Sequence, residues 1–273
     1  MRLPRPPDWI IYALAVLGLT GVALARRERA DAPRAPPPVP GLEGVLTAGP
    51  SSMGASVRAL PTANHPAGAA FSVSDSGVWL TAERVVRGCR RTAVLVAPGR
   101  GVLAKVFADR SSDLAVLTTE GGTPALPLVL NARLDSGARG YQPGYPQGAP
   151  GEATSRLLGR DALRATTRGA TRHAVLVWAE DGRTEGLEGG LAGLSGAPVL
   201  DHAGRVVGVT LAEAPRRGRI YSAPPQAMGA IMAAAGQTPS SFAQGLTITT
   251  DNYGRAADAL RRDLRVVQVA CAD

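Results

Sequence analysis

Aromatic side chains, lysine, histidine and cysteine are all scarce in this chain of 273 residues. Aromatic residues make up 4% of it, so any hydrophobic core has to be built mainly from Val, Leu and Ala. Lys105 is the only lysine, and the formal net charge of +8 therefore comes from arginine. No basic run is interleaved with the aromatic residues that a stacking platform for nucleic acid needs. We expect no nucleic-acid partner.

Potential metal ligands are too scattered to predict a metal site. The two cysteines and three histidines show no paired spacing of the kind that zinc sites use. The glycine-rich run 186–193 is not a dinucleotide loop, because it lacks the preceding strand and the following helix that a pyrophosphate site requires. The sequence thus predicts neither a metal nor a cofactor. The even number of cysteines permits one disulfide if the chain is exported.

Charge is absent from residues 9–25, a run of 17 residues with arginines on both sides. That length is at the short edge of what a membrane-spanning helix needs. We expect an uncleaved signal anchor, that is, a transmembrane helix within residues 1–30. A cleaved signal peptide is the alternative, because residues 23–25 (Ala-Leu-Ala) resemble a cleavage site. A buried core helix is disfavoured, because no polar residues define a second face.

A proline-rich segment, residues 31–45, should form an extended linker that holds the folded part away from the bilayer. Residues 46–273 form one domain of short runs rich in Val, Leu and Ile, bounded by Gly, Pro, Asp or Ser. Short strands of this kind are typical of a β-barrel or a β-sandwich. Helices are predicted at 225–235 and at 254–262, before a last strand at 265–270.

Three segments of this domain form a pattern. The first, residues 68–86, contains Gly-Ala-Ala-Phe and Leu-Thr-Ala-Glu-Arg-Val-Val. The second, 113–117, reads Asp-Leu-Ala-Val-Leu, and the third, 193–198, reads Gly-Leu-Ser-Gly-Ala-Pro. In order and spacing they resemble the trypsin-like serine peptidases, and within them the bacterial high-temperature-requirement (HtrA-like) branch, over residues 65–220. The resemblance implies an all-β fold of two six-stranded antiparallel Greek-key barrels (chymotrypsin-like) with a C-terminal helix.

The resemblance also implies a role for individual residues. A serine hydroxyl is a poor nucleophile near neutral pH unless a base contacts it and an acid orients that base. By resemblance, Ser195 is the nucleophile and Asp113 the orienting acid. The backbone N–H groups of Gly193 and Ser195 would form the oxyanion hole. Gly189 would lie at the base of the primary specificity pocket without bringing charge there, which favours small or apolar substrate side chains.

Arg84 stands where the family has its catalytic histidine. Arginine stays protonated at ordinary pH and has no lone pair to accept the serine proton. It can instead pair with Asp113, in the place that the imidazole would take. No other histidine is expected near the serine hydroxyl; the three in the chain are His65, His173 and His202.

Further features separate this chain from many relatives. Leu194 replaces the aspartate that pairs with a newly cut N-terminus in many trypsin relatives, so activation by such a cut is not expected. The 37 residues after residue 236 are too few for the peptide-binding PDZ domain common in the HtrA-like branch. Trypsin relatives often have a cysteine just after the histidine, which suggests a Cys89–Cys271 bridge pinning the last strand to the first barrel. Two unpaired buried cysteines are the alternative.

Three functions remain open from the sequence. The chain can be a membrane-anchored serine endopeptidase homologue, impaired because Arg84 is not a base. It can be a non-catalytic pseudoprotease module that binds a peptide or a partner protein, or an anchored scaffold. We expect a peptide or protein ligand, and a membrane contact through residues 1–30. The basic flank after the uncharged run argues weakly against export. The cysteines and the domain type favour an inner-membrane anchor with a periplasmic or extracytoplasmic domain.

Overall fold

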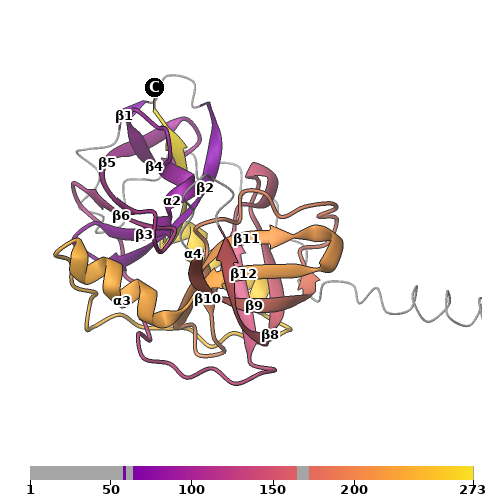
Figure 1. Cartoon of the computed structure of the whole chain (residues 1–273). Coiled ribbons are helices and arrows are strands. Elements are labelled where there is room, and N and C mark those ends of the chain that lie inside the picture. Colours follow the sequence, from indigo (N-terminus) through magenta and orange to yellow (C-terminus); the bar gives the residue numbers. More distant parts are fainter. Residues whose placement is uncertain (1–57, 60–63, 165–171, 273) are drawn as a thin grey trace, which may run out of the picture.

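The computed structural model describes residues 58–59, 64–164 and 172–272. The predicted membrane helix and proline-rich linker lie outside these residues. No helix within the described part of the chain is long and apolar enough to cross a membrane. The described residues form two β-barrels, with helices α3 (Pro225–Ala234) and α4 (Tyr253–Arg262) packed against them (Figure 1).

The first barrel combines five strands that are consecutive in sequence with the last strand of the chain. Its order is β5-β4-β13-β2-β3-β6, and β6 pairs with β5 to close it. Short β1 (Arg58–Ala59) extends the sheet beyond β5, and helix α2 (Glu83–Val86) follows β3 at once. The barrel strands are β2 (Asn64–Ser74), β3 (Val78–Ala82), β4 (Thr92–Ala97), β5 (Arg100–Asp109), β6 (Leu114–Thr119) and β13 (Val266–Cys271).

The second barrel closes in the order β10-β11-β12-β9-β8-β7. The 3-10 turn η3 (Pro146–Gly148) joins β7 to β8, and η4 (Pro215–Arg217) joins β11 to β12. Two six-stranded antiparallel barrels confirm the predicted chymotrypsin-like fold. The strands of this barrel are β7 (Arg139–Gly144), β8 (Gly151–Arg164), β9 (Arg172–Arg183), β10 (Pro198–Leu200), β11 (Val206–Ala214) and β12 (Arg219–Ala223).

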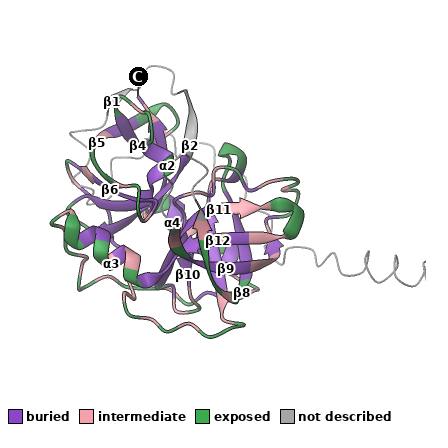
Figure 2. Ribbon diagram, in the orientation of Figure 1, coloured by how far each residue is buried: buried purple, intermediate pink, exposed green. Residues whose placement is uncertain are grey.

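Both cores consist mainly of Val, Leu and Ala, as the scarcity of aromatic residues predicts, and the buried residues follow the strands (Figure 2). Trp79 in the first barrel and Trp178 in the second are fully buried. A buried indole N–H needs an acceptor. Trp79 Nε1 donates to Thr119 Oγ1 at 3.0 Å, and Trp178 Nε1 donates to Ser222 Oγ at 2.8 Å.

The last strand pairs with strands that are distant from it in the sequence. β13 pairs antiparallel with both β2 and β4, so the first barrel closes only with the C-terminal segment of the chain. Cys271 at the end of β13 lies opposite Thr92, and its Sγ is bonded to Sγ of Cys89 across a sequence separation of 182. The structure therefore contains the disulfide that the resemblance suggested, and this bond fastens β13 beside β4.

Candidate active site

Three separate elements carry the candidate catalytic residues. Ser195 lies in the loop before β10, Asp113 in the turn between β5 and β6, and Arg84 in helix α2. The loop of Ser195 contacts the first barrel directly, because the N–H of Ala69 donates to the Ser195 carbonyl oxygen at 2.8 Å. A Cβ on Gly68 would lie 2.6 Å from that same oxygen. Glycine is therefore required where the first barrel meets the loop of the candidate nucleophile.

Arg84 forms an ion pair with Asp113. Its Nε donates to Oδ2 of Asp113 at 3.1 Å, and its Nη2 contacts the same oxygen. The aspartate side chain is almost completely buried, whereas 37% of the arginine side chain is exposed. The N–H of Glu83 donates to the main-chain carbonyl of Asp113 at 2.9 Å, which fixes the turn against α2. The guanidinium of Arg84 thus occupies Oδ2, the side-chain oxygen of Asp113 that accepts hydrogen bonds.

A second arginine approaches the other oxygen of Asp113. Oδ1 is buried without a hydrogen-bond partner among the described residues, and Nη2 of Arg87 lies 3.8 Å away. Glu83 holds Arg87 through a bond of 2.8 Å from Nε to Oε2, and this bond raises the pKa of Arg87. Guanidinium groups therefore approach both oxygens of the acid, and neither can accept a proton.

The Ser195 hydroxyl has a main-chain acceptor instead of a base. Its Oγ donates to the carbonyl oxygen of Leu211 on β11 at 3.0 Å. Of the histidines, His173 lies on β9 and His202 in the turn after β10, and neither described imidazole is hydrogen-bonded to Ser195. The side chain of His65 lies outside the described residues. Nothing among the described side chains replaces the missing base.

The backbone around Gly193 leaves donors free for an anion. Gly193 has a φ of 98°, in the left-handed region that favours glycine, and a Cβ there would lie 2.4 Å from the carbonyl oxygen of Tyr145. The N–H of Leu194 closes a turn onto the Leu191 carbonyl at 2.9 Å. The N–H groups of Gly193 and Ser195 donate to no acceptor in the described part of the chain. Two such donors are what an oxyanion or a carboxylate requires.

The cavity beside Ser195 is small, about 30 Å³. Its charged group is Glu213 of β11, whose Oε2 accepts from the N–H of Leu191 at 2.6 Å. Gly189, which the resemblance places at the pocket base, is not among the lining residues; its carbonyl accepts from Arg183 Nη1 at 2.7 Å. Only a small side chain fits this space. The lining residues are Leu191, Ala192, Leu194, Ser195, Thr210, Ala212, Glu213 and Ile220.

Gln147 holds the loop that precedes Ser195, and no sequence motif marks it. Its Nε2 donates to the carbonyl oxygens of Glu188 at 2.5 Å and Gly190 at 2.9 Å. Its backbone N–H contacts the carbonyl of Ala192. Gln147 in the turn η3 thereby holds residues 188–192, the segment that contains the candidate specificity residue Gly189.

The C-terminal segment in turn supports η3. Arg261 of α4 is buried, and it donates to the Gly144 carbonyl at 3.3 Å and to Oε2 of Glu152 at 3.0 Å. Tyr145 donates its hydroxyl to the carbonyl of Val266 at 3.3 Å. Burial raises the pKa of Tyr145 to about 12, so the hydroxyl keeps the proton it donates. The final helix and strand thus position the turn that positions the candidate oxyanion loop.

This fold and this arrangement of segments define a class of protein. Residues 68–209 match the family described as the trypsin-like peptidase domain, and the chain belongs to that family. HhoA from Synechocystis, which is named as a serine protease, is 30% identical over 200 residues, covering 67% of this chain and 48% of HhoA. The chain therefore spans about half the length of this curated relative.

Solved structures share the fold. The Rv3671c protease of M. tuberculosis in its active form superimposes with a TM-score of 0.53 at 20% identity, covering 89% of this chain and 97% of that one. The HtrA-type protease AlgW with a decapeptide gives a TM-score of 0.51 at 21% identity, covering 62% of this chain and 52% of AlgW. Together, the family match, the similarity to HhoA and these two structures confirm the resemblance to HtrA-like serine peptidases.

Proposed function

We propose that this chain is a membrane-anchored HtrA-like peptidase homologue that binds peptide segments in its cleft and hydrolyses them poorly or not at all. The ion pair between Arg84 and Asp113 carries the proposal. In a serine peptidase the base next to the acid takes the proton of the nucleophile, and a guanidinium has no lone pair to do so. The proton of Ser195 is instead donated to a carbonyl oxygen, which leaves the hydroxyl a weak nucleophile.

Peptide binding is supported by the parts of the cleft that need no base. Within the described residues, β10 pairs with β11 only as far as Val209, while β12 continues along β11 to Ala214. An extended peptide can add to such a one-sided edge. The free N–H groups of Gly193 and Ser195 can donate hydrogen bonds to a peptide carbonyl or carboxylate oxygen. AlgW, which shares the fold, was solved with a decapeptide.

The size of the cavity beside Ser195 predicts which peptides bind. We expect decapeptides that differ at one central position to bind more tightly with alanine there than with leucine or arginine, because the 30 Å³ space admits only a small side chain. Fluorescence polarisation measures the affinities, and mass spectrometry of the recovered peptides shows whether they stay intact.

Filling that cavity provides the control for this prediction. Ala212→Trp places a large ring among the lining residues and is expected to abolish binding. Ala230→Trp adds the same ring on the exposed side of α3 and should leave binding unchanged. Equal affinity for all three peptides, or rapid cleavage of the alanine peptide by the unaltered protein, would refute the proposal.

The proposed anchor and compartment rest on separate observations. The uncharged run at residues 9–25 supports a membrane helix. The bond between Cys89 and Cys271 supports a compartment outside the cytoplasm, because disulfides persist in oxidising surroundings. In spheroplasts, added protease should therefore digest the domain while residues 1–30 stay with the membrane. Protection of the domain until the membrane is lysed would place it on the cytoplasmic side.

A further inference from the structure

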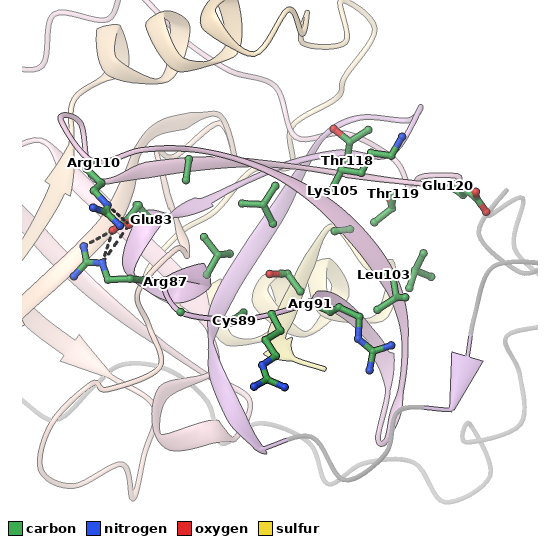
Figure 3. Close-up of a pocket in the computed structure, with 18 residues that line it drawn as sticks. Glu83, Arg87, Cys89, Arg91, Leu103, Lys105, Arg110, Thr118, Thr119 and Glu120 are labelled. Carbon is green, nitrogen blue, oxygen red and sulfur yellow. Dashed lines mark hydrogen bonds and ion pairs between the residues drawn. The ribbon is translucent and has the colours of Figure 1, made fainter. Parts of the chain in front are cut away.

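Three arginines of the first barrel are joined by two carboxylates. Nε of Arg84 donates to Oδ2 of Asp113 at 3.1 Å, and Nη2 of Arg87 lies 3.8 Å from Oδ1 of Asp113. Nε of Arg87 donates to Oε2 of Glu83 at 2.8 Å, and Nε of Arg110 lies 3.6 Å from Oε1 of Glu83. Figure 3 shows Arg87 and Arg110 converging on the Glu83 carboxylate. The five side chains form one ion-pair network, and Arg84, Arg87 and Arg110 are its arginine cluster.

The network presents its positive charge to the solvent. The side chains of the two carboxylates are 4% and 6% exposed, whereas those of Arg84, Arg87 and Arg110 are 37%, 52% and 84% exposed. Three cations against two anions leave one uncompensated positive charge. Because the anions are buried and the cations are not, a ligand that approaches this surface meets guanidinium groups.

The outer N–H groups of the arginine cluster have no acceptor. A guanidinium has five N–H donors. Within the residues that the structure describes, Nη1 of Arg84, Nη1 of Arg87 and both Nη atoms of Arg110 donate no hydrogen bond. The neighbouring carboxylate of Asp109 does not take them, because it accepts from two serine hydroxyls of its own turn. The cluster therefore has donors left for an external anion.

The arginine cluster lies next to the loop of Ser195. A Cβ on Gly68 would lie 2.6 Å from the Ser195 carbonyl oxygen and 2.6 Å from Cγ2 of Val85. Val85 follows Arg84 in α2, so this helix and the loop of the candidate nucleophile meet at one glycine. A peptide with one side chain in the cavity beside Ser195 therefore brings its neighbouring residues to the arginine cluster.

We infer that the arginine cluster binds an acidic side chain of the peptide, so that preferred peptides combine a small residue in the cavity beside Ser195 with a nearby aspartate or glutamate. This inference rests on the peptide binding proposed above. The planar fork of arginine donors matches the two oxygens of a carboxylate. A lysine side chain at the same place would meet like charge. The net charge of +8 also attracts acidic peptides to the chain.

A positional scan of decapeptides tests the inference. Each peptide keeps the central alanine and carries glutamate, glutamine or lysine at one other position, and fluorescence polarisation measures its binding to the full chain. At one or two positions near the alanine, glutamate should bind about fivefold more tightly than glutamine, and lysine more weakly than glutamine. The preference should shrink between about 0.1 M and 1 M NaCl, where the Debye length falls from about 10 Å to about 3 Å.

Charge reversal at Arg110 separates the arginine cluster from general charge. Arg110→Glu turns three cations and two anions into two cations and three anions, so lysine should then bind at least as tightly as glutamate at the selected position. Arg110→Gln leaves the network neutral and should bring the glutamate and glutamine peptides to within about twofold of each other. Arg160→Glu makes the same charge change at an exposed position of β8 and should keep the glutamate preference.

The outcomes distinguish this inference from the proposed function. Alanine peptides that bind without discriminating between glutamate and lysine would overturn the inference and leave the proposed function standing. Equal effects of Arg110→Glu and Arg160→Glu would overturn it as well. Absence of binding by every peptide would refute the proposed function, and this inference with it.

Discussion

Replacing Arg84 with histidine is expected to raise kcat/KM for the alanine-containing decapeptide by about 10³-fold or more. Loss of one triad member costs about 10⁴- to 10⁶-fold in serine peptidases, and the substitution restores the missing group without optimising its surroundings. An imidazole has a lone pair near neutral pH and can orient its N–H on Asp113, which is already buried and held in its turn. The free donors at Gly193 and Ser195 are then available to the oxyanion.

Two controls make this gain specific to the base. Arg84→Gln removes the charge and supplies a polar side chain that is not a base, and it should give no gain. Arg84→His/Ser195→Ala should lose what Arg84→His gained. A folded Arg84→His variant that hydrolyses no faster than the unaltered protein would show that the candidate oxyanion site has lost its catalytic geometry as well.

Replacing Arg261 with methionine is expected to lower the free energy of unfolding by about 3–5 kcal/mol, the cost of breaking a buried ion pair by removing one partner. Arg261 contacts Glu152 at 3.0 Å and Asp258 at 2.5 Å, and its side chain is 6% exposed. The substitution leaves both carboxylates buried without their cation. Urea unfolding of the full chain measures the loss, and Arg262→Met, which truncates an exposed side chain on the same helix, should cost little.

The loss should also depend on pH. Burial raises the pKa of Glu152, and Arg261 opposes that rise, so the pKa should climb further in the variant. An acid whose pKa is raised in the folded state binds more protons in the folded protein than in the unfolded chain. Its favourable contribution to the free energy of unfolding is therefore lost as the pH rises through the folded-state pKa. The variant should therefore be less impaired at pH 5 than at pH 7. Equal losses at both values would contradict this role for Glu152.

Local sequence signals predicted the strands that are continuous apolar runs and the three segments that carry the candidate site. They indicate β8 only weakly, because its 14 residues mix Glu152, Thr154 and Arg156 with few β-branched apolar residues. The pairing of β13 between β2 and β4 depends on contacts across the whole chain, which no local pattern records. Arg261 looks like an exposed helix residue in sequence, and only the tertiary structure shows that it is buried.

The details of the cleft could not be predicted from the sequence for the same reason. Gln147 and Glu213 belong to no motif, and their importance comes from the backbone groups they bond in a loop distant in sequence. Arg84 differs, because a strongly patterned segment surrounds it and makes the substitution readable without a structure. Only the tertiary structure shows the consequence: Arg84 pairs with Asp113, and Ser195 donates to a main-chain carbonyl.

Reaction with a fluorophosphonate probe tests most directly whether the serine is activated, since these reagents label a serine hydroxyl only when a base and an oxyanion site assist it. The unaltered protein should be labelled no faster than Ser195→Ala, and Arg84→His should be labelled rapidly at Ser195. Rapid labelling of Ser195 in the unaltered protein, lost in Ser195→Ala, would contradict the account.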